Sequence, residues 1–201
     1  MLKTKIAVLV SGGGTNLQAL LDAQKSGILK SGKIELVISN KEGAYALERA
    51  KKCNVKTLVL PSKELGKSFE SELVKALDEN QIELIILAGF MKILSADFTS
   101  RYDKRILNVH PSLIPSFCGE GFYGLKVHEA ALSYGVKVTG ATVHYVNEIP
   151  DGGEIILQKA VKILKTDTPE TLQRRVMEQA EWKILPKATE IASKKIAKEK
   201  K

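Results

Sequence analysis

Short apolar runs alternate with segments of helical periodicity over the first ninety residues, and this alternation constrains the fold of the chain most strongly. Four runs are rich in Ile, Val and Leu on both faces: KIAVLV, KIELVIS, VKTLVLP and IELIILAGF, residues 5–10, 33–39, 55–61 and 82–90. The segments between them, residues 15–27, 43–54 and 68–80, place apolar residues at helical spacing. Runs that are apolar on both faces are typical of buried parallel strands. The repeated strand–helix order therefore predicts an α/β fold with a doubly wound, mostly parallel sheet.

The second half of the chain predicts a different arrangement. RILNVH, residues 105–110, is a short fifth strand, and residues 125–134 predict a helix. Two longer strands, 136–146 and 153–163, are joined through NEIPDGG, where Gly152 and Gly153 indicate a tight turn and an antiparallel hairpin at one edge of the sheet. Residues 167–196 predict a C-terminal helix with Asp167 or Thr168 as N-cap and Pro169 at its first position.

Neither an internal repeat nor a linker interrupts this order, so a single domain over residues 1–201 is the simplest division. It has a first half of about residues 1–100, a second half of about 101–190 and a basic tail, 191–201. Much of the net charge of +8 lies in that tail, which has no aromatic residues to stack on bases. We therefore expect no nucleic-acid partner. The tail is expected to be a solvated helix end or to fray.

Several further classes are disfavoured by composition. No apolar run reaches the roughly 18 residues of a membrane span, and the N-terminus lacks the long apolar region of a signal peptide. Two cysteines, Cys53 and Cys118, give neither a disulfide framework nor a metal-binding pattern. We expect a cytoplasmic protein with no membrane partner and no metal.

Three adjacent glycines stand between the first strand and the first helix, in VLVSGGGTNLQAL. Glycine permits close backbone approach, and a helix N-terminus offers free N–H groups, so a phosphate is the natural ligand. No Gly-Lys-Ser/Thr follows, which excludes a P-loop, and Leu17 stands where a dinucleotide fingerprint needs its third glycine. A tight turn without a ligand remains the alternative.

An amide and an imidazole, Asn108 and His110, end the fifth strand and share one face of it. An imidazole can exchange a proton near neutral pH, and an amide N–H can stabilise a developing oxyanion. Asp151, in IPDGG, either orients this imidazole and raises its pKa or only shapes a turn. For the other two histidines, His128 and His144, we expect structural roles.

Apolar residues continue past the end of the fourth strand, in LAGFMKILS, residues 87–95. In open α/β sheets this end of a strand faces the ligand crevice. The segment is therefore either one wall of a slot for a flat ring or a cover for a neighbouring helix.

Taken together, SGGGTNLQAL, LAGFMKILS, NVHPSLIPSF, VKVTGATVHYV and DGGEIILQ resemble the phosphoribosylglycinamide formyltransferase family in order and spacing, from about Ile6 to Pro186. The resemblance implies the formyltransferase fold. It also implies transfer of the formyl group of 10-formyltetrahydrofolate, a co-substrate, to the amine of glycinamide ribonucleotide in purine synthesis. The first half of the chain would then bind phosphate, and the second half would bind folate and carry catalysis.

Site residues follow from the resemblance position by position. It implies a catalytic trio of Asn108, His110 and Asp151. The implied ribonucleotide-binding residues are Gly13, Gly14, Thr15, Asn16 and Glu181. The implied folate-binding residues are Lys67, Met91, Lys92, Ile93, Leu94, Asn108 and Asn147. Trp182 departs from the family's usual His, and Gly66 and Lys67 stand where an Arg is common.

The implied partners are the two small-molecule substrates. The oligomeric state is left open, with a homodimer as one alternative. Methionyl-tRNA formyltransferase would need a second domain, and formyltetrahydrofolate deformylase usually carries an N-terminal regulatory domain. A non-catalytic nucleotide-binding protein would need no Asn108–His110–Asp151 set, and a dehydrogenase would need an acidic residue after the second strand.

Overall fold

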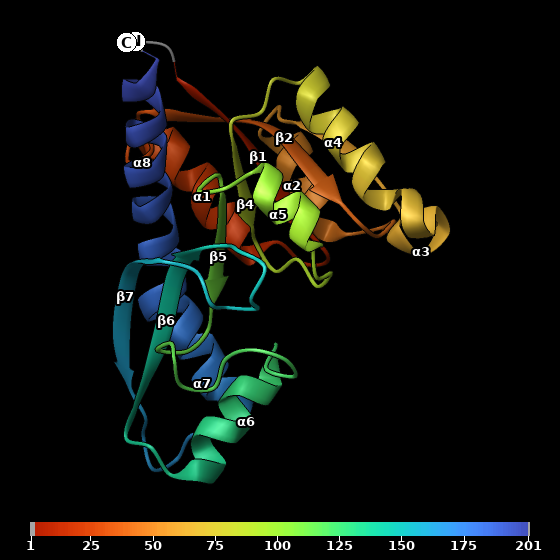
Figure 1. The fold of residues 1–201 in the computed structure, drawn as a ribbon. Coiled ribbons are helices and arrows are strands. Elements are labelled where there is room, and N and C mark those ends of the chain that lie inside the picture. The colour runs from red at the N-terminus through yellow and green to blue at the C-terminus, as the bar shows by residue number, and fades with distance from the viewer. Residues whose placement is uncertain (1–2, 201) are drawn as a thin grey trace.

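A seven-stranded sheet forms the centre of the computed structural model, which describes residues 3–200. The strands lie in the order β3-β2-β1-β4-β5-β6-β7 (Figure 1). In chain order they are β1 Thr4–Val10, β2 Gly32–Ser39, β3 Lys56–Val59, β4 Leu84–Leu87, β5 Ile106–His110, β6 Val138–Tyr145 and β7 Ile155–Lys162. The first five are parallel, whereas β6 is antiparallel to both β5 and β7. The predicted fold class is confirmed.

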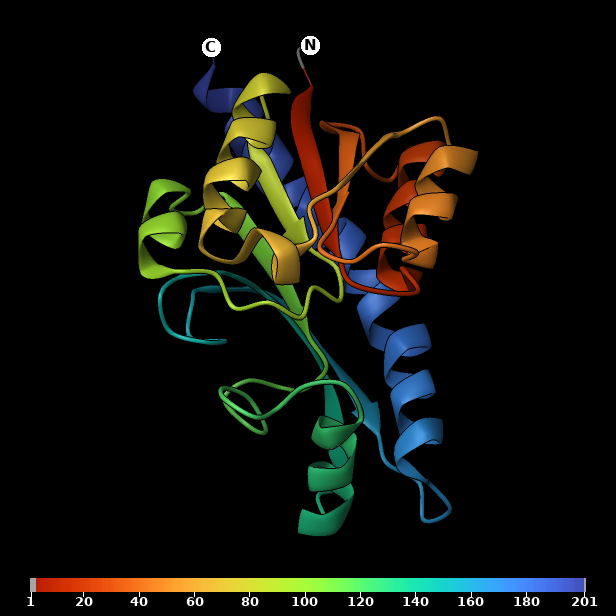
Figure 2. The same ribbon diagram turned by 90° about the vertical axis from the view of Figure 1, so that its right-hand side faces the viewer.

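Helices cover both faces of the sheet. They are α1 Thr15–Ser26, α2 Tyr45–Lys52, α3 Ser62–Leu65, α4 Phe69–Glu79, α5 Ala96–Arg101, α6 Leu125–Tyr134, α7 Pro169–Val176 and α8 Trp182–Glu199, with a 3-10 turn at Gly66–Ser68 and a π-helix at Met177–Glu181. On one face α1 and α8 pack against the strands, and on the other face lie α4 and α5 (Figures 1 and 2).

The alternation of side chains along β1 shows why two layers of helices are needed. Ile6, Val8 and Val10 point into the core on the α1 and α8 side, whereas Ala7 and Leu9 point into the core beneath α4 and α5. All five are buried. Burying one such Val, Leu or Ile side chain contributes about 1.5–3 kcal/mol, so a strand with two apolar faces is stable only between two layers.

The end of α8 is ordered against the sheet in place of the frayed tail that the lysine-rich sequence allowed. The Thr4 hydroxyl donates a hydrogen bond to the Ser193 carbonyl at 2.9 Å. At the end of α8, Glu199 pairs with Arg105, and Lys200, the next residue, pairs with Glu83. The far end of the helix is therefore tied to the edge where the parallel strands begin.

The link between β6 and β7 is longer than the tight turn expected at Gly152 and Gly153. It spans residues 146–154, and its turn has the Gly152 N–H donating to the Ile149 carbonyl at 3.0 Å. A Cβ at Gly153 would collide with the carbonyl of Tyr145. The glycines therefore let this segment fold back closely against β6.

Three segments for which the sequence predicted ligand contacts meet at the carboxyl ends of the parallel strands. The glycine loop follows β1, residues 88–95 follow β4, and His110 ends β5. These three strands are neighbours in the sheet, at the point where its order reverses. That is where open α/β sheets bind their ligands.

Candidate active site

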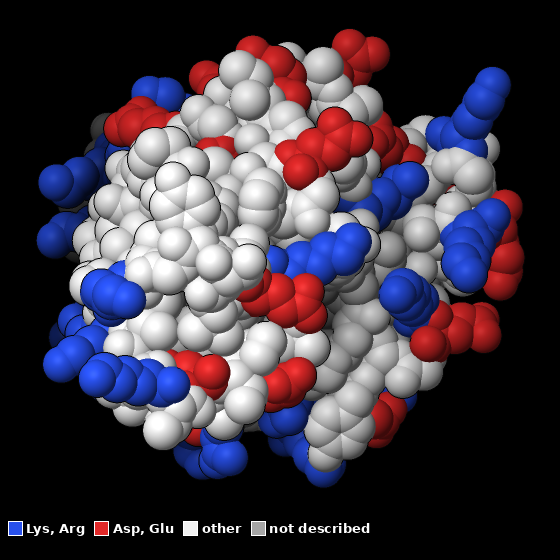
Figure 3. All heavy atoms as spheres, turned by 90° about the horizontal axis from the view of Figure 1, so that it is seen from below, with Lys and Arg blue, Asp and Glu red and all other residues white. Residues whose placement is uncertain are grey.

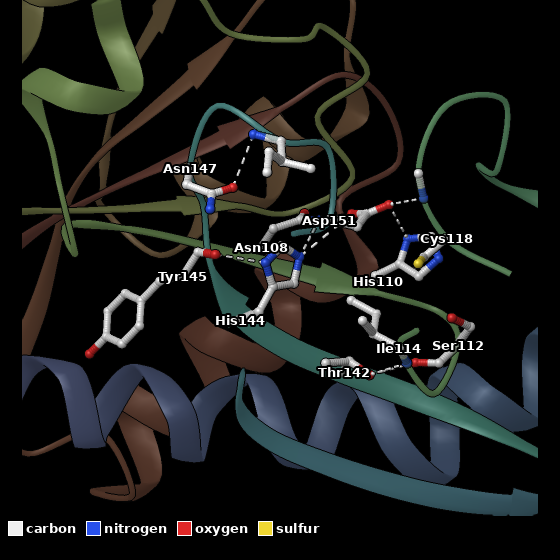
Figure 4. Close-up of polar contacts among 12 residues, drawn as sticks. Asn108, His110, Ser112, Ile114, Cys118, Thr142, His144, Tyr145, Asn147 and Asp151 are labelled. Carbon is white, nitrogen blue, oxygen red and sulfur yellow. Dashed lines mark hydrogen bonds and ion pairs between the residues drawn. The ribbon is translucent and has the colours of Figure 1, made fainter. Parts of the chain in front are cut away.

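Asn108, His110 and Asp151, the trio that the resemblance implied, lie close together (Figure 4). Asn108 and His110 lie on β5 two residues apart, so both face the segment that carries Asp151. The Asn108 Nδ2 donates to Asp151 Oδ1 at 3.3 Å, and His110 Nδ1 lies 3.4 Å from Asp151 Oδ2. The side chains of His110 and Asp151 are only 5% and 12% exposed, so their interaction is shielded from solvent.

His144 is a fourth member of this cluster that the sequence reasoning assigned a structural role. It lies opposite Asn108 in the antiparallel register of β5 and β6. Its Nε2 lies 3.5 Å from Asp151 Oδ1 and 3.3 Å from Asn108 Nδ2 (Figure 4). Its Nδ1 donates to the Tyr145 carbonyl at 2.7 Å. In the sequence, His144 could be recognised only as a residue on a strand of alternating polarity. That pattern does not show which residue of the neighbouring strand lies opposite it.

The loop after β5 supplies backbone partners to the same cluster. The His110 Nε2 faces the Phe117 carbonyl at 2.8 Å, and the Gly119 N–H donates to Asp151 Oδ2 at 2.9 Å. Asp151 has φ 56°, which is uncommon for a residue with a side chain. These bonds from β5, β6 and the 111–124 loop hold its carboxylate in place.

The pKa of His110 differs from the sequence-based expectation. Burial lowers this pKa, and the charge of Asp151 and the carbonyl of Phe117 only partly offset the lowering. Both ring nitrogens nevertheless face oxygen acceptors, so the imidazolium is well held whenever it forms. For Asp151, burial raises the pKa, but the hydrogen bond to His144, the charge of His110 and the Gly119 N–H together lower it. The cluster therefore contains an ionised carboxylate beside an imidazole that releases its proton readily.

The predicted phosphate loop has the geometry of a helix N-terminus. Gly14 is the N-cap of α1 with φ 73°, and a Cβ there would lie 2.6 Å from the Ala46 Cβ. Glycine is thus required by its backbone conformation and by the close approach of α2. The first N–H groups of α1, with its positive dipole end, lie beside Gly13 and Gly14.

Glu181 meets this loop across 165 residues of chain. The Asn16 Nδ2 donates to Glu181 Oε2 at 2.7 Å, and both side chains are buried. The π-helix Met177–Glu181 ends at this residue, and π-bulges often mark functional sites. The Asn16 Oδ1 is buried without a hydrogen-bond donor among residues 3–200. Thr15 also faces the π-helix, with its hydroxyl 3.9 Å from Met177 Sδ.

Burial raises the pKa of Glu181 from 4.5 to about 7, with the hydrogen bond from Asn16 opposing the shift. The native state then holds a proton that the unfolded chain releases, so stability falls as pH rises from about 4.5 to 7. At about 1.4 kcal/mol per pKa unit, this shift corresponds to about 3 kcal/mol. Urea unfolding measures the free energy of unfolding at each pH. Between pH 4.5 and 7 this free energy should fall by about 3 kcal/mol less in Glu181→Gln than in the unsubstituted protein. Parallel curves for the two proteins would contradict the assignment.

The predicted folate segment leaves the end of β4 and is tied to the residue that follows β1, because the Met91 N–H donates to Ser11 Oγ at 2.9 Å. Met91 and Ile93 are 52% and 74% exposed, whereas Leu94 is buried beneath α4 and α5. The Lys92 ammonium lies 5.2 Å from the ring centroid of Phe69. Two apolar side chains are therefore presented to solvent at the ligand-facing edge, and Leu94 anchors the segment in the core.

The remaining predicted folate residues lie in two other segments. Asn147 accepts a hydrogen bond from the Ile149 N–H at 3.0 Å and so shapes the loop that carries Asp151. Lys67 lies in the 3-10 turn before α4. Their part in folate binding stays a prediction.

A cavity of about 590 Å³ between α1 and α8 borders the glycine loop, with Thr15, Arg49 and Trp182 in its wall. Asn108, His110 and Asp151 do not line it. Within residues 3–200, no group of three or more His, Cys, Asp or Glu side chains could hold a metal ion, and no described helix is long and apolar enough to cross a membrane.

The charge on one face of the molecule is mixed. Seen from below, Lys and Arg side chains alternate with Asp and Glu side chains around a broad uncharged area (Figure 3). The net charge of +8 therefore does not produce a continuous basic surface on this face.

The chain matches a known protein family over most of its length. The family model described as formyl transferase matches residues 4–189. The chain belongs to the formyl transferase family. It is 44% identical to the phosphoribosylglycinamide formyltransferase of Haemophilus influenzae, over 90% of the chain and 84% of that protein. The resemblance to phosphoribosylglycinamide formyltransferases drawn from the motifs is confirmed.

Two further relatives show the range of architectures. The chain is 44% identical to the human trifunctional purine biosynthetic protein adenosine-3, over 95% of the chain but only 18% of that protein. The crystal structure of glycinamide ribonucleotide transformylase 1 from Symbiobacterium toebii superposes with a TM-score of 0.89 at 39% identity, covering 96% of this chain and 89% of that one. The chain thus spans less than a fifth of the trifunctional relatives and most of the shorter ones.

Proposed function

We propose that the chain transfers the formyl group of 10-formyltetrahydrofolate to the glycine amine of glycinamide ribonucleotide in purine biosynthesis. The observation that carries this proposal is the convergence of Asn108, His110 and Asp151 at the ligand-facing edge of a formyl transferase sheet. The names of the relatives support the ribonucleotide as the formyl acceptor, and the motif resemblance implies the folate as co-substrate.

The site residues divide the chemistry. The substrate amine attacks the formyl carbon directly, and negative charge grows on the formyl oxygen. Asn108 donates a hydrogen bond to this oxyanion in place of its 3.3 Å contacts with Asp151 and His144. The proton lost by the amine passes through His110 to the leaving nitrogen of the folate, and Asp151 stabilises the imidazolium while it exists. The scheme forms no covalent enzyme intermediate and uses no metal.

Binding of the two substrates is assigned to separate segments. Gly13, Gly14, Thr15, Asn16 and Glu181 bind the ribonucleotide, and the segment from Met91 to Leu94 forms one wall of the pterin slot, with Asn147 closing over it. We infer one domain over residues 1–201 that acts in the cytoplasm on small molecules. A homodimer is one alternative for its oligomeric state.

A direct test is to incubate the purified protein with both substrates and follow formylated glycinamide ribonucleotide and tetrahydrofolate by mass spectrometry. Equal amounts of the two products are expected, and an Asn108→Ala variant should form neither at a comparable rate. Release of formate in place of the formylated ribonucleotide would identify a deformylase and overturn the proposal.

The folate assignment predicts a specific pattern of hydrogen exchange. A non-reactive folate analogue should slow exchange of the amides of residues 90–94, since it covers a segment with two exposed apolar side chains. The ribonucleotide alone should protect residues 13–16 in the glycine loop. The opposite pattern would exchange the two binding sites.

A further inference from the structure

Arg49, on α2, is bound to the glycine loop although neither its sequence context nor the resemblance assigned it a role. Its Nε donates to the Gly13 carbonyl at 2.8 Å, and its Nη1 donates to Gln18 Oε1 at 3.1 Å. Its Cζ lies 5.0 Å from the ring centroid of Tyr45, which restricts the guanidinium further. One planar cation therefore links the loop to the first turn of α1 and to α2.

A second hydrogen bond also joins α2 to the glycine loop. The Ala46 N–H donates to the Gly12 carbonyl at 3.0 Å, so two successive carbonyls of the loop are turned toward α2. In a planar trans peptide the C=O and N–H point in opposite directions. The N–H groups of Gly13 and Gly14 are thus turned away from α2, and neither has an acceptor among the described residues. Successive backbone N–H groups aimed at one side form an anion-binding concavity.

We propose that Arg49 is a positioning and specificity residue for the substrate phosphate. It holds the Gly13–Gly14 peptide with its N–H toward the phosphate, and its positive charge behind the same peptide raises the affinity for a dianion. This inference rests on the proposed function, because it takes the ribonucleotide phosphate as the anion. Arg49 acts through the loop, and no contact between its guanidinium and the substrate is required.

Three variants separate orientation from charge. Arg49→Met keeps a long apolar stem but removes the charge and both hydrogen bonds, whereas Arg49→Lys keeps the charge and loses the planar fork. Lys52→Met is the matched control, because its ammonium lies 5.9 Å from the same Tyr45 ring and makes no contact with the loop that the structure records. Thermal unfolding of each variant establishes that it is folded.

The measurement is binding of ribose 5-phosphate by titration calorimetry, which needs neither folate nor formyl transfer. Loss of a charge-assisted hydrogen bond should weaken binding by about 10- to 100-fold in Arg49→Met. Arg49→Lys should lie between this variant and the unsubstituted protein, and Lys52→Met should bind within about twofold of the unsubstituted protein. In steady-state assays, Arg49→Met should raise the KM for the ribonucleotide and leave kcat and the folate KM unchanged.

A spectroscopic signature distinguishes positioning from general support of the fold. In ¹⁵N-labelled protein, ribose 5-phosphate should shift the amide protons of Gly13 and Gly14 downfield, and Arg49→Met should abolish that shift at concentrations that saturate the unsubstituted protein. Unchanged affinity and unchanged amide shifts in folded Arg49→Met would overturn the inference, as would the absence of binding to the unsubstituted protein. Normal phosphate binding without formyl transfer would instead refute the proposed function alone.

Discussion

Replacing Asp151 by asparagine should lower kcat by about 100- to 1,000-fold, within the range expected for loss of acid–base assistance, and should leave ribonucleotide binding nearly intact. The carboxylate accepts hydrogen bonds from Asn108 and Gly119 and lies within 3.5 Å of both His110 and His144. An amide would remove the charge that stabilises the His110 imidazolium and would present an NH₂ group to some of these donors. Steady-state kinetics and ribose 5-phosphate titration measure the two effects separately.

A double-mutant cycle tests whether Asp151 acts through His110. If the two residues work as a unit, Asp151→Asn combined with His110→Ala should cost much less than the product of the two single losses. Glu148→Gln is the matched control, because it removes an exposed carboxylate from the same loop and should be nearly silent. If the rate losses of the two single variants instead multiply, the two residues act independently. Asp151 would then shape the folate loop and take no part in catalysis.

Replacing Gly14 by valine should raise the KM for the ribonucleotide by about tenfold or more, with little effect on the KM for the folate. The backbone at Gly14 has φ 73°, and an added Cβ would lie 2.6 Å from the Ala46 Cβ and 2.8 Å from the Ala46 Cα. A β-branched residue in this conformation costs at least about 1–3 kcal/mol, and the loop must shift away from α2 to accept it. The N–H groups that would surround the phosphate move with the loop.

Gly12→Ala provides the control for this change. A Cβ at Gly12 meets no atom within 4 Å and requires no left-handed backbone, so this variant should keep a nearly normal KM for both substrates. Circular dichroism and thermal unfolding show whether Gly14→Val remains folded. Equal increases in the KM values of both substrates would indicate a general disruption and would withdraw the phosphate assignment from the loop.

The parts of this protein that the sequence determined depend on residues close together in the chain. Apolar runs and helical spacing predicted the parallel strands and their helices, because a strand that is apolar on both faces must be covered on both. Strand period two placed Asn108 and His110 on one face. The three glycines before Thr15 predicted the strand–turn–helix of the phosphate loop, and Thr168 and Pro169 predicted the start of α7, where Thr168 forms a capping box.

The position of Asp151 could be predicted from the sequence only in part. The Asp-Gly pair identified a turn, and the motif resemblance implied a catalytic role, but the expected tight turn at Gly152 and Gly153 is a longer loop in the structure. That loop brings Asp151 to Asn108 across 43 residues of chain. Local turn chemistry could not show how far the segment folds back, because this depends on the close approach of Gly153 to β6.

Only the tertiary structure decided which distant groups meet and how deeply they are buried. The register of β5 and β6 brings His144 to Asn108, the π-helix brings Glu181 to Asn16, and the packing of α2 brings Arg49 to Gly13. Burial also decided the direction of the His110 pKa, since desolvation outweighs the nearby carboxylate that the sequence had suggested would raise it. Strand register, helix packing and desolvation all depend on contacts between segments far apart in the chain, whereas periodicity and turn chemistry are properties of neighbouring residues.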